Sequence, residues 1–246
     1  MKIVTPALVV YLMIADDTPD LIEAAVRGGA TAIEIGIPYS DPLADGPTIQ
    51  RAGQRSLDAG MTPPRALEIL AEIDRRVDVP LIPMTYGAII ESYGREQFCA
   101  AAAAAGAEGL IAVDVPPEES GELRDAAAAA GIDLVHLVAP TSRTERLHAA
   151  AGASRGFVYL VAAMGTTGAR EQLDDRLAGM IGIVKEAAGD TPVLTGFGIS
   201  QPAHVAAVLA AGADGAVVGS AAVEAADRGG PAELEAFVRS LATALR

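Results

Sequence analysis

The feature that most constrains the fold is an alternation of two kinds of segment along the chain. Short apolar runs recur, and each is followed by a segment with the apolar spacing of an amphipathic helix. Strands that read as near-continuous apolar runs are typical of a parallel sheet covered by helices on both faces. The expected strands are residues 7–14, 31–37, 80–86, 109–115, 132–139, 156–162, 191–197 and 215–219.

The number of these units decides between two folds built on parallel sheets. Eight strand–helix units in 246 residues match an α/β fold with one domain, a (β/α)8 or TIM barrel over residues 1–246. An open doubly wound sheet would favour a glycine-rich turn after the first strand, and that turn here reads ADDTPD. No linker or shift in composition suggests a second domain. We therefore expect a barrel whose working face lies at the C-terminal ends of its strands.

Charge and composition exclude several classes of partner. The formal net charge of −14 repels nucleic acid and anionic membranes, so we expect neither as a partner. The single cysteine, Cys99, allows no intrachain disulfide and no cysteine metal cluster, and we expect it to be buried on a helix. The first apolar stretch is too short to span a bilayer and lacks a signal-peptide cleavage site. We expect a cytoplasmic protein.

A carboxylate inside the second strand is the first candidate for chemistry. Strand alternation places Glu34 on one face with Ala32 and Gly36, opposite a row of isoleucines that suits the helix-facing side. Glu34 should therefore point into the barrel near its mouth, where apolar surroundings raise its pKa and suit it to acid–base work near neutral pH. The alternative is a structural Glu paired with a buried arginine, but no arginine lies in an expected strand.

The loop that follows this strand holds a second candidate. It reads PYSDPLADGPT over residues 38–48, and its prolines stiffen it. One interpretation returns Asp45 over the barrel mouth towards Glu34. The other makes Asp45 a cap for the helix that begins near Thr48. The residues alone leave both open.

Glycine-rich loops follow three later strands, at residues 163–170, 195–200 and 218–222. Backbone N–H groups in such loops, together with a short helix after the eighth strand, form the phosphate site common in this fold. Gly198, Gly219 and Ser220 are the candidates, with Gly168 closing from the first of these loops. The alternative is that these are ordinary turns between strands and helices.

Two kinds of chemistry are disfavoured. The lysines are Lys2 and Lys185, and neither lies at a strand end, so no Schiff base is expected. His148 and His204 fall in helical patterns, and His136 in the fifth strand reads as a satisfied core residue, so no metal site is expected. Any carbon–carbon chemistry would depend on carboxylates alone.

At this point the residues resemble a known family. IEIGIPYSDPLADGPTIQ, residues 33–50, is similar to the signature of the tryptophan synthase alpha subunit family. The resemblance covers nearly the whole chain through MTYG (84–87), VDVPPEES (113–120), MGTTGAR (164–170), GFGIS (196–200) and VGSA (218–221), all in family order. It implies a (β/α)8 barrel that cleaves indole-3-glycerol phosphate to indole and glyceraldehyde 3-phosphate without a cofactor.

The resemblance also implies roles for individual residues. Glu34 would be the general acid/base that moves protons between the indole C3 and the glycerol hydroxyl. Asp45 would accept a hydrogen bond from the indole N–H and stabilise the cationic indolenine. The other matching positions are Tyr159, an active-site tyrosine near Glu34; Tyr11 and Tyr86, beside the indole pocket; Thr167, in the closing loop; and the phosphate binders Gly168, Gly198, Gly219 and Ser220.

The chain departs from the family pattern at the bottom and rim of the barrel. Only MKIVTP precedes the first strand, so the barrel is expected to lack most of the family's N-terminal plug helix. Ala88 stands where an Asn is usual, and Thr166 where a Val is usual. A tryptophan synthase beta subunit is the partner that the family implies. The alternatives are a divergent stand-alone lyase in a specialised pathway and a non-catalytic activator of a beta-type partner. The intact pair of Glu34 and Asp45 argues against the last.

Overall fold

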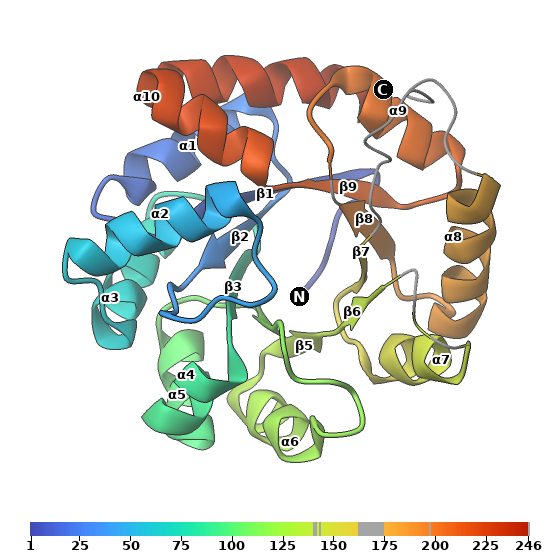
Figure 1. Ribbon diagram of the computed structural model, residues 1–246, viewed down its shortest axis with the longest axis horizontal. Coiled ribbons are helices and arrows are strands. Elements are labelled where there is room, and N and C mark those ends of the chain that lie inside the picture. The colour runs from blue at the N-terminus through green and yellow to red at the C-terminus, as the bar shows by residue number, and fades with distance from the viewer. Residues whose placement is uncertain (140–141, 143, 162–174, 197, 246) are drawn as a thin grey trace.

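A computed structural model describes residues 1–139, 142, 144–161, 175–196 and 198–245. Its strands form one sheet in which every neighbouring pair is parallel. The strands are β1 Ala7–Met13, β2 Ala32–Gly36, β3 Leu81–Thr85, β4 Gly109–Ala112, β5 Asp133–Val135, β6 Leu137–Val138, β7 Val158–Val161, β8 Val193–Gly196 and β9 Gly215–Val218. They form a ring inside a layer of helices (Figure 1), so the expected barrel is confirmed and the open doubly wound sheet is wrong.

The first and last strands in the order of the sheet, β5 and β6, are two parts of one expected strand. The strand order is β5-β4-β3-β2-β1-β9-β8-β7-β6, and only His136 separates β5 from β6 along the chain. The prediction of one continuous strand over residues 132–139 is therefore wrong. The reason is that the His136 N–H donates to the hydroxyl of Ser154 at 3.0 Å instead of to a neighbouring strand. β5 consequently pairs with β4, and β6 pairs with β7.

His136 itself is the satisfied core residue that the sequence predicts. Its side chain is buried, and its Nε2 lies 3.4 Å from the hydroxyl oxygen of Ser120. Burial lowers its pKa to about 4, so the imidazole is neutral at physiological pH.

Helices cover the outer face of the sheet (Figure 1). Their bounds are α1 Thr18–Gly28, α2 Pro47–Asp58, α3 Pro63–Asp74, α4 Gly87–Tyr93, α5 Arg95–Ala104, α6 Gly121–Ala130, α7 Thr144–Ala153, α8 Asp175–Ala188, α9 Pro202–Ala210 and α10 Ser220–Ala242. Cys99, on α5, is fully buried as expected. Within the described ranges, none of these helices combines the length and the apolar character that a bilayer crossing requires.

Strand alternation divides the core into an inner and an outer layer. Ile33 and Ile35 of β2 belong to the cluster that packs under the helices, whereas Ala32 belongs to the cluster inside the ring. Burial of each such isoleucine contributes about 1.5–3 kcal/mol to stability. The same alternation directs Glu34 inwards, so its expected orientation is confirmed.

The N-terminal residues lie at the bottom of the ring. Residues 1–6 form neither a helix nor a strand, and the chain begins near the middle of the barrel in Figure 1. Ile3 and Met1 pack against the inner cluster. A Cβ atom at Gly156 would lie 2.2 Å from the Met1 methyl carbon, so this glycine leaves room for the methionine.

Candidate active site

Glu34 is a buried acid without a partner among the described residues. It is 1% exposed, and no described residue donates a hydrogen bond to its Oε1. Burial raises the pKa of Glu34 from its ordinary value of 4.5 to about 8. Within the described ranges, no arginine or lysine forms an ion pair with it, so the interpretation of a structural Glu–Arg pair finds no support there. A carboxyl group held protonated in this way can give a proton near neutral pH.

Two tyrosines flank this carboxyl group. The Cα of Tyr11 on β1 is the register partner of Glu34, and Tyr159 approaches from β7. Burial, and after it charges that include that of Glu34, raise the pKa of both tyrosines well above the ordinary value. Both phenols therefore stay protonated. The structure thus brings together Glu34, Tyr11 and Tyr159, which are far apart in the sequence.

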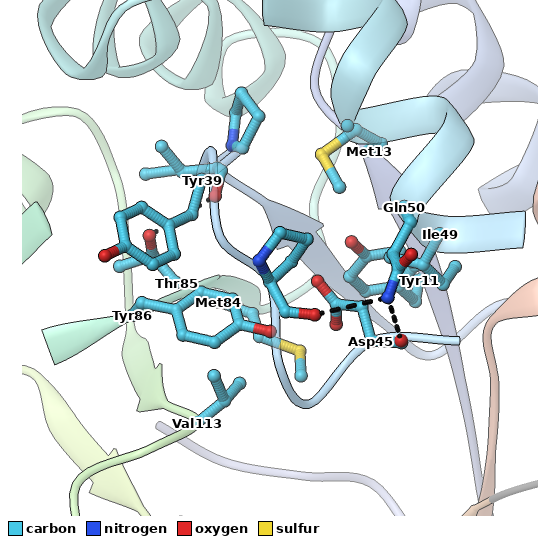
Figure 2. Close-up of a pocket in the computed structure, with 14 residues that line it drawn as sticks. Tyr11, Met13, Tyr39, Asp45, Ile49, Gln50, Met84, Thr85, Tyr86 and Val113 are labelled. Carbon is cyan, nitrogen blue, oxygen red and sulfur yellow. Dashed lines mark hydrogen bonds between the residues drawn. The ribbon is translucent and has the colours of Figure 1, made fainter. Parts of the chain in front are cut away.

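Asp45 lies in the loop between β2 and α2, and three contacts hold this loop over the barrel mouth (Figure 2). The side-chain amide of Gln50 donates to the carbonyl oxygen of Asp45 at 2.9 Å and to that of Pro42 at 3.4 Å. The N–H of Ala44 donates to the hydroxyl of Tyr86 at 3.0 Å. The prediction that Asp45 returns over the mouth agrees with this arrangement.

The capping alternative for Asp45 is wrong. Helix α2 begins at Pro47 with Gly46 as its N-cap, and no side chain caps it. The carboxylate is instead partly buried, which raises its pKa, while the nearby phenol of Tyr86 opposes that shift.

An apolar pocket surrounds Asp45 (Figure 2). The rings of Tyr39 and Tyr86 lie 5.0 Å apart and form one wall. The other apolar lining residues are Tyr11, Met13, Ile37, Pro38, Pro42, Ile49, Met84 and Val113. Aromatic and methionine side chains suit a flat, apolar ring, and Asp45 supplies one hydrogen-bond acceptor for an N–H group on it.

The candidate phosphate residues that the structure describes lie at one edge of the sheet. Gly198 follows β8, Gly219 follows the neighbouring β9, and Ser220 begins α10. Gly198 has a φ of 77°, a conformation that favours glycine. Gly198 and Ser220 are exposed and Gly219 is partly exposed, so the N-terminus of α10 is open to an anion. Thr167 and Gly168 lie outside the described residues.

Three neighbours of these groups escaped the sequence reasoning. Gln50 and Tyr39 both stand in the stretch 33–50, but no local signal shows that a glutamine binds two carbonyl groups before it or that two tyrosine rings meet. Strand alternation predicts only that Gly36 faces inwards, whereas its lack of a side chain also makes room for Tyr11.

The chain is similar to known proteins along nearly its whole length. A model of the family described as tryptophan synthase alpha chain matches residues 2–244. The tryptophan synthase alpha chain of Prochlorococcus marinus (strain MIT 9313) is 46% identical over 222 residues, covering 89% of this chain and 80% of that protein. The alpha chain of Geobacillus kaustophilus (strain HTA426) is 42% identical over 261 residues, covering 99% and 96%.

Solved structures agree with the sequence comparisons. Tryptophan synthase from M. tuberculosis in its aminoacrylate-bound form superposes with a TM-score of 0.88 at 34% identity, covering 98% of this chain and 94% of that one. The tryptophan synthase a2b2 complex of Pyrococcus furiosus gives a TM-score of 0.88 at 37% identity, covering 96% and 98%. The Pyrococcus furiosus structure is a complex of alpha and beta subunits.

Proposed function

The chain belongs to the tryptophan synthase alpha chain family, the indole-3-glycerol phosphate lyases of tryptophan biosynthesis, and we propose that Glu34 and Asp45 carry its reaction. The observation that supports these roles most directly is the Oε1 atom of Glu34. It is buried and has no partner among the described residues. A buried polar atom without a partner is unfavourable, so a bound substrate that supplies the partner would be favoured.

Glu34 transfers protons in both halves of the proposed cleavage. Because its pKa is about 8, the carboxyl group is protonated at neutral pH and gives its proton to the indole C3. The resulting carboxylate takes the proton of the glycerol hydroxyl as the carbon–carbon bond breaks. The bonding electrons return to the ring, and indole and glyceraldehyde 3-phosphate are released with Glu34 protonated again. The electrons of the broken carbon–carbon bond stay with the indole ring and the protein only moves protons, so the steps need no cofactor.

Asp45 has the complementary role. Protonation at C3 places positive charge on the indole ring, and a carboxylate that accepts a hydrogen bond from the ring N–H stabilises that cation. The wall formed by Tyr39 and Tyr86 and the ring of Tyr11 would hold the indole against Asp45. Tyr159 would limit access of water to Glu34 from the β7 side.

The phosphate group would lie at the N-terminus of α10. The exposed backbone there, with Gly219 and Ser220, faces the same edge of the sheet as Gly198, and a helix N-terminus favours an anion. We also assign Thr167 and Gly168 to substrate binding, on the resemblance of MGTTGAR to the family alone.

Two proposals concern the ends of the barrel. Met1 and Ile3 would fill the bottom in place of most of the plug helix, since both pack on the inner cluster. At the mouth, Leu43 is 96% exposed in the loop that carries Asp45, and a beta subunit that covered this loop would bury it. The complexes of the homologues support such a partner. The chain would act as one barrel domain over residues 1–246.

Indole release from indole-3-glycerol phosphate tests the assignment. The protein is assayed alone, with a tryptophan synthase beta subunit, and as Glu34→Gln, with Glu186→Gln on the far α8 helix as the matched control. We expect release that rises with the beta subunit and that Glu34→Gln reduces roughly 10²–10⁴-fold. Equal release without the beta subunit would indicate a stand-alone lyase. Release that survives in Glu34→Gln would refute the role of Glu34.

A further inference from the structure

The hydroxyl of Tyr11 lies where the side chain of residue 36 would be if that residue were not a glycine. A Cβ atom at Gly36 would lie 2.1 Å from the Tyr11 hydroxyl oxygen and 2.7 Å from its Cζ. Non-bonded heavy atoms do not approach so closely, so Tyr11 cannot keep this position beside any other residue at 36. Among the described glycines, no other would bring a Cβ atom closer to a neighbour.

This contact fixes where the ring lies. Glu34 and Gly36 both face the barrel interior on β2, and Gly36 is nearer the mouth. Tyr11 begins level with Glu34 on β1 and its hydroxyl lies at Gly36, so its ring extends from the level of Glu34 towards the mouth. At the mouth, Tyr11 lies beside Asp45 (Figure 2).

The charges agree with a ring placed between two carboxyl groups. Asp45 and Glu34 both raise the pKa of Tyr11, after the larger effect of burial. By contrast, burial alone raises the pKa of Glu34, and burial opposed by Tyr86 sets that of Asp45. Tyr11 is thus close enough to both acids for each of them to affect its pKa.

We propose that Tyr11 is a positioning residue for the carboxyl pair: locked by Gly36, its ring separates Glu34 from Asp45 so that the two acids act independently. This inference rests on the proposed function, which needs the two acids in opposite states. Glu34 must carry a proton, and Asp45 must be an ionised acceptor. Carboxyl groups in direct contact share one proton and titrate as a pair. Glu34 would then not be reliably protonated while Asp45 is ionised.

Four variants separate the lock from the ring. Gly36→Ala adds the methyl group that displaces Tyr11, and Tyr11→Phe removes the hydroxyl but keeps the ring. The double variant combines these changes, and Tyr11→Leu removes the ring without crowding the strand. Gly182→Ala, on the exposed face of α8 with open space around its Cβ, is the matched control.

Two readouts are measured for each variant. The first is the pH profile of kcat for indole release. The second needs no substrate: the carbonyl stretch of protonated Glu34, assigned by difference infrared spectroscopy against Glu34→Gln, is titrated with pH. The titratable groups that face Glu34 from the described elements are Tyr11 on β1 and Tyr159 on β7, with Asp45 and Tyr86 beyond Tyr11.

The proposal expects a specific pattern. Gly36→Ala and Tyr11→Leu should lower kcat at least tenfold and change the infrared titration from one step to two. Tyr11→Phe, which keeps the ring, should keep the single-step titration and lose less activity than Tyr11→Leu, and the double variant should recover at least threefold over Gly36→Ala because the clashing oxygen is gone. Gly182→Ala should be unchanged.

Two results would overturn it. One is an unchanged single-step titration in Gly36→Ala or, where that variant does not fold, in Tyr11→Leu. The other is a double variant no better than Gly36→Ala. A wild-type protein that releases no indole would instead refute the proposed function, and the infrared titration would still decide whether Tyr11 separates the acids.

Discussion

The backbone N–H of Ala44 donates a hydrogen bond of 3.0 Å to the hydroxyl of Tyr86. This bond joins the loop after β2 to the end of β3, and it connects two segments that are 42 residues apart in the chain. The same phenol lies close enough to Asp45 to oppose the rise in the pKa of its carboxyl group. One tyrosine therefore holds the backbone of the loop and influences the ionisation of its carboxylate.

Tyr86→Phe should impair this loop while leaving the barrel intact. The loss of the bond leaves the Ala44 N–H without its partner, which should lower stability by about 1 kcal/mol. Because Asp45 is then less well placed, we expect kcat/KM for indole release to fall roughly tenfold. Urea unfolding and steady-state kinetics measure the two effects. Tyr93→Phe, on α4 away from the pocket, is the control, and equal kinetics for both variants would contradict the role of Tyr86.

The stability of the protein should depend on pH through Glu34. Its pKa is about 8 when folded and about 4.5 when unfolded, so folding takes up a proton between these values. The free energy of unfolding should therefore fall as pH rises from 4.5 to 8, by at most about 5 kcal/mol. Glu34→Gln lacks this titration. Chemical unfolding is measured at pH 5 and pH 8.5. The free energy of unfolding should decrease more between these pH values in the wild type than in Glu34→Gln, and equal decreases would contradict the prediction.

The rate of cleavage should follow the protonated form of Glu34. Since the proposed first step transfers its proton to the indole C3, kcat/KM should be level below about pH 7 and should fall as pH rises through about 8. Initial rates of indole release from pH 5.5 to 9.5 test this. The substrate phosphate also titrates, near pH 6. Binding of inorganic phosphate is therefore measured over the same pH range to separate its effect from that of Glu34. If kcat/KM instead fell as the pH was lowered and stayed constant up to pH 9, the proton donor would be a group other than Glu34.

Gly198→Ala should weaken the phosphate end of the site. Its φ of 77° is unfavourable for alanine by about 1–2 kcal/mol, so the loop after β8 should move. We expect KM to rise roughly tenfold with a smaller change in kcat, since the phosphate lies away from the reacting atoms. Gly189→Ala carries the same kind of strain, with a φ of 60°, at the opposite end of β8. A similar rise in KM for both variants would indicate a general loss of stability instead.

Leu43→Ser should affect the response to a beta subunit and not the basal reaction. Leu43 is 96% exposed, so its side chain makes almost no packing contact within the chain. The substitution should therefore leave basal indole release unchanged. Activation by the beta subunit should fall at least fivefold if the loop lies in the interface, since buried apolar anchors dominate such contacts. Val4→Ser, 62% exposed before β1, is the control. Full activation of Leu43→Ser would place the interface elsewhere.

The sequence by itself determined the architecture and the orientation of its main candidate. Alternation of apolar runs with helical spacing predicted the parallel barrel, and the order of residues within β2 directed Glu34 inwards. These properties follow from local rules, because strand alternation and helical spacing depend only on residues a few positions apart. Family resemblance then supplied roles for residues that spacing alone left open.

Only the tertiary structure decided the features that depend on contacts between residues far apart in the sequence. The strand break at His136 arises because Ser154 accepts its N–H, and the position of the Asp45 loop over the mouth depends on the Tyr86 hydroxyl. The room that Gly36 leaves for Tyr11 exists only once β1 lies beside β2. Each of these contacts joins side chains from different elements. No local pattern encodes them, because their geometry is set by the packing of the whole barrel.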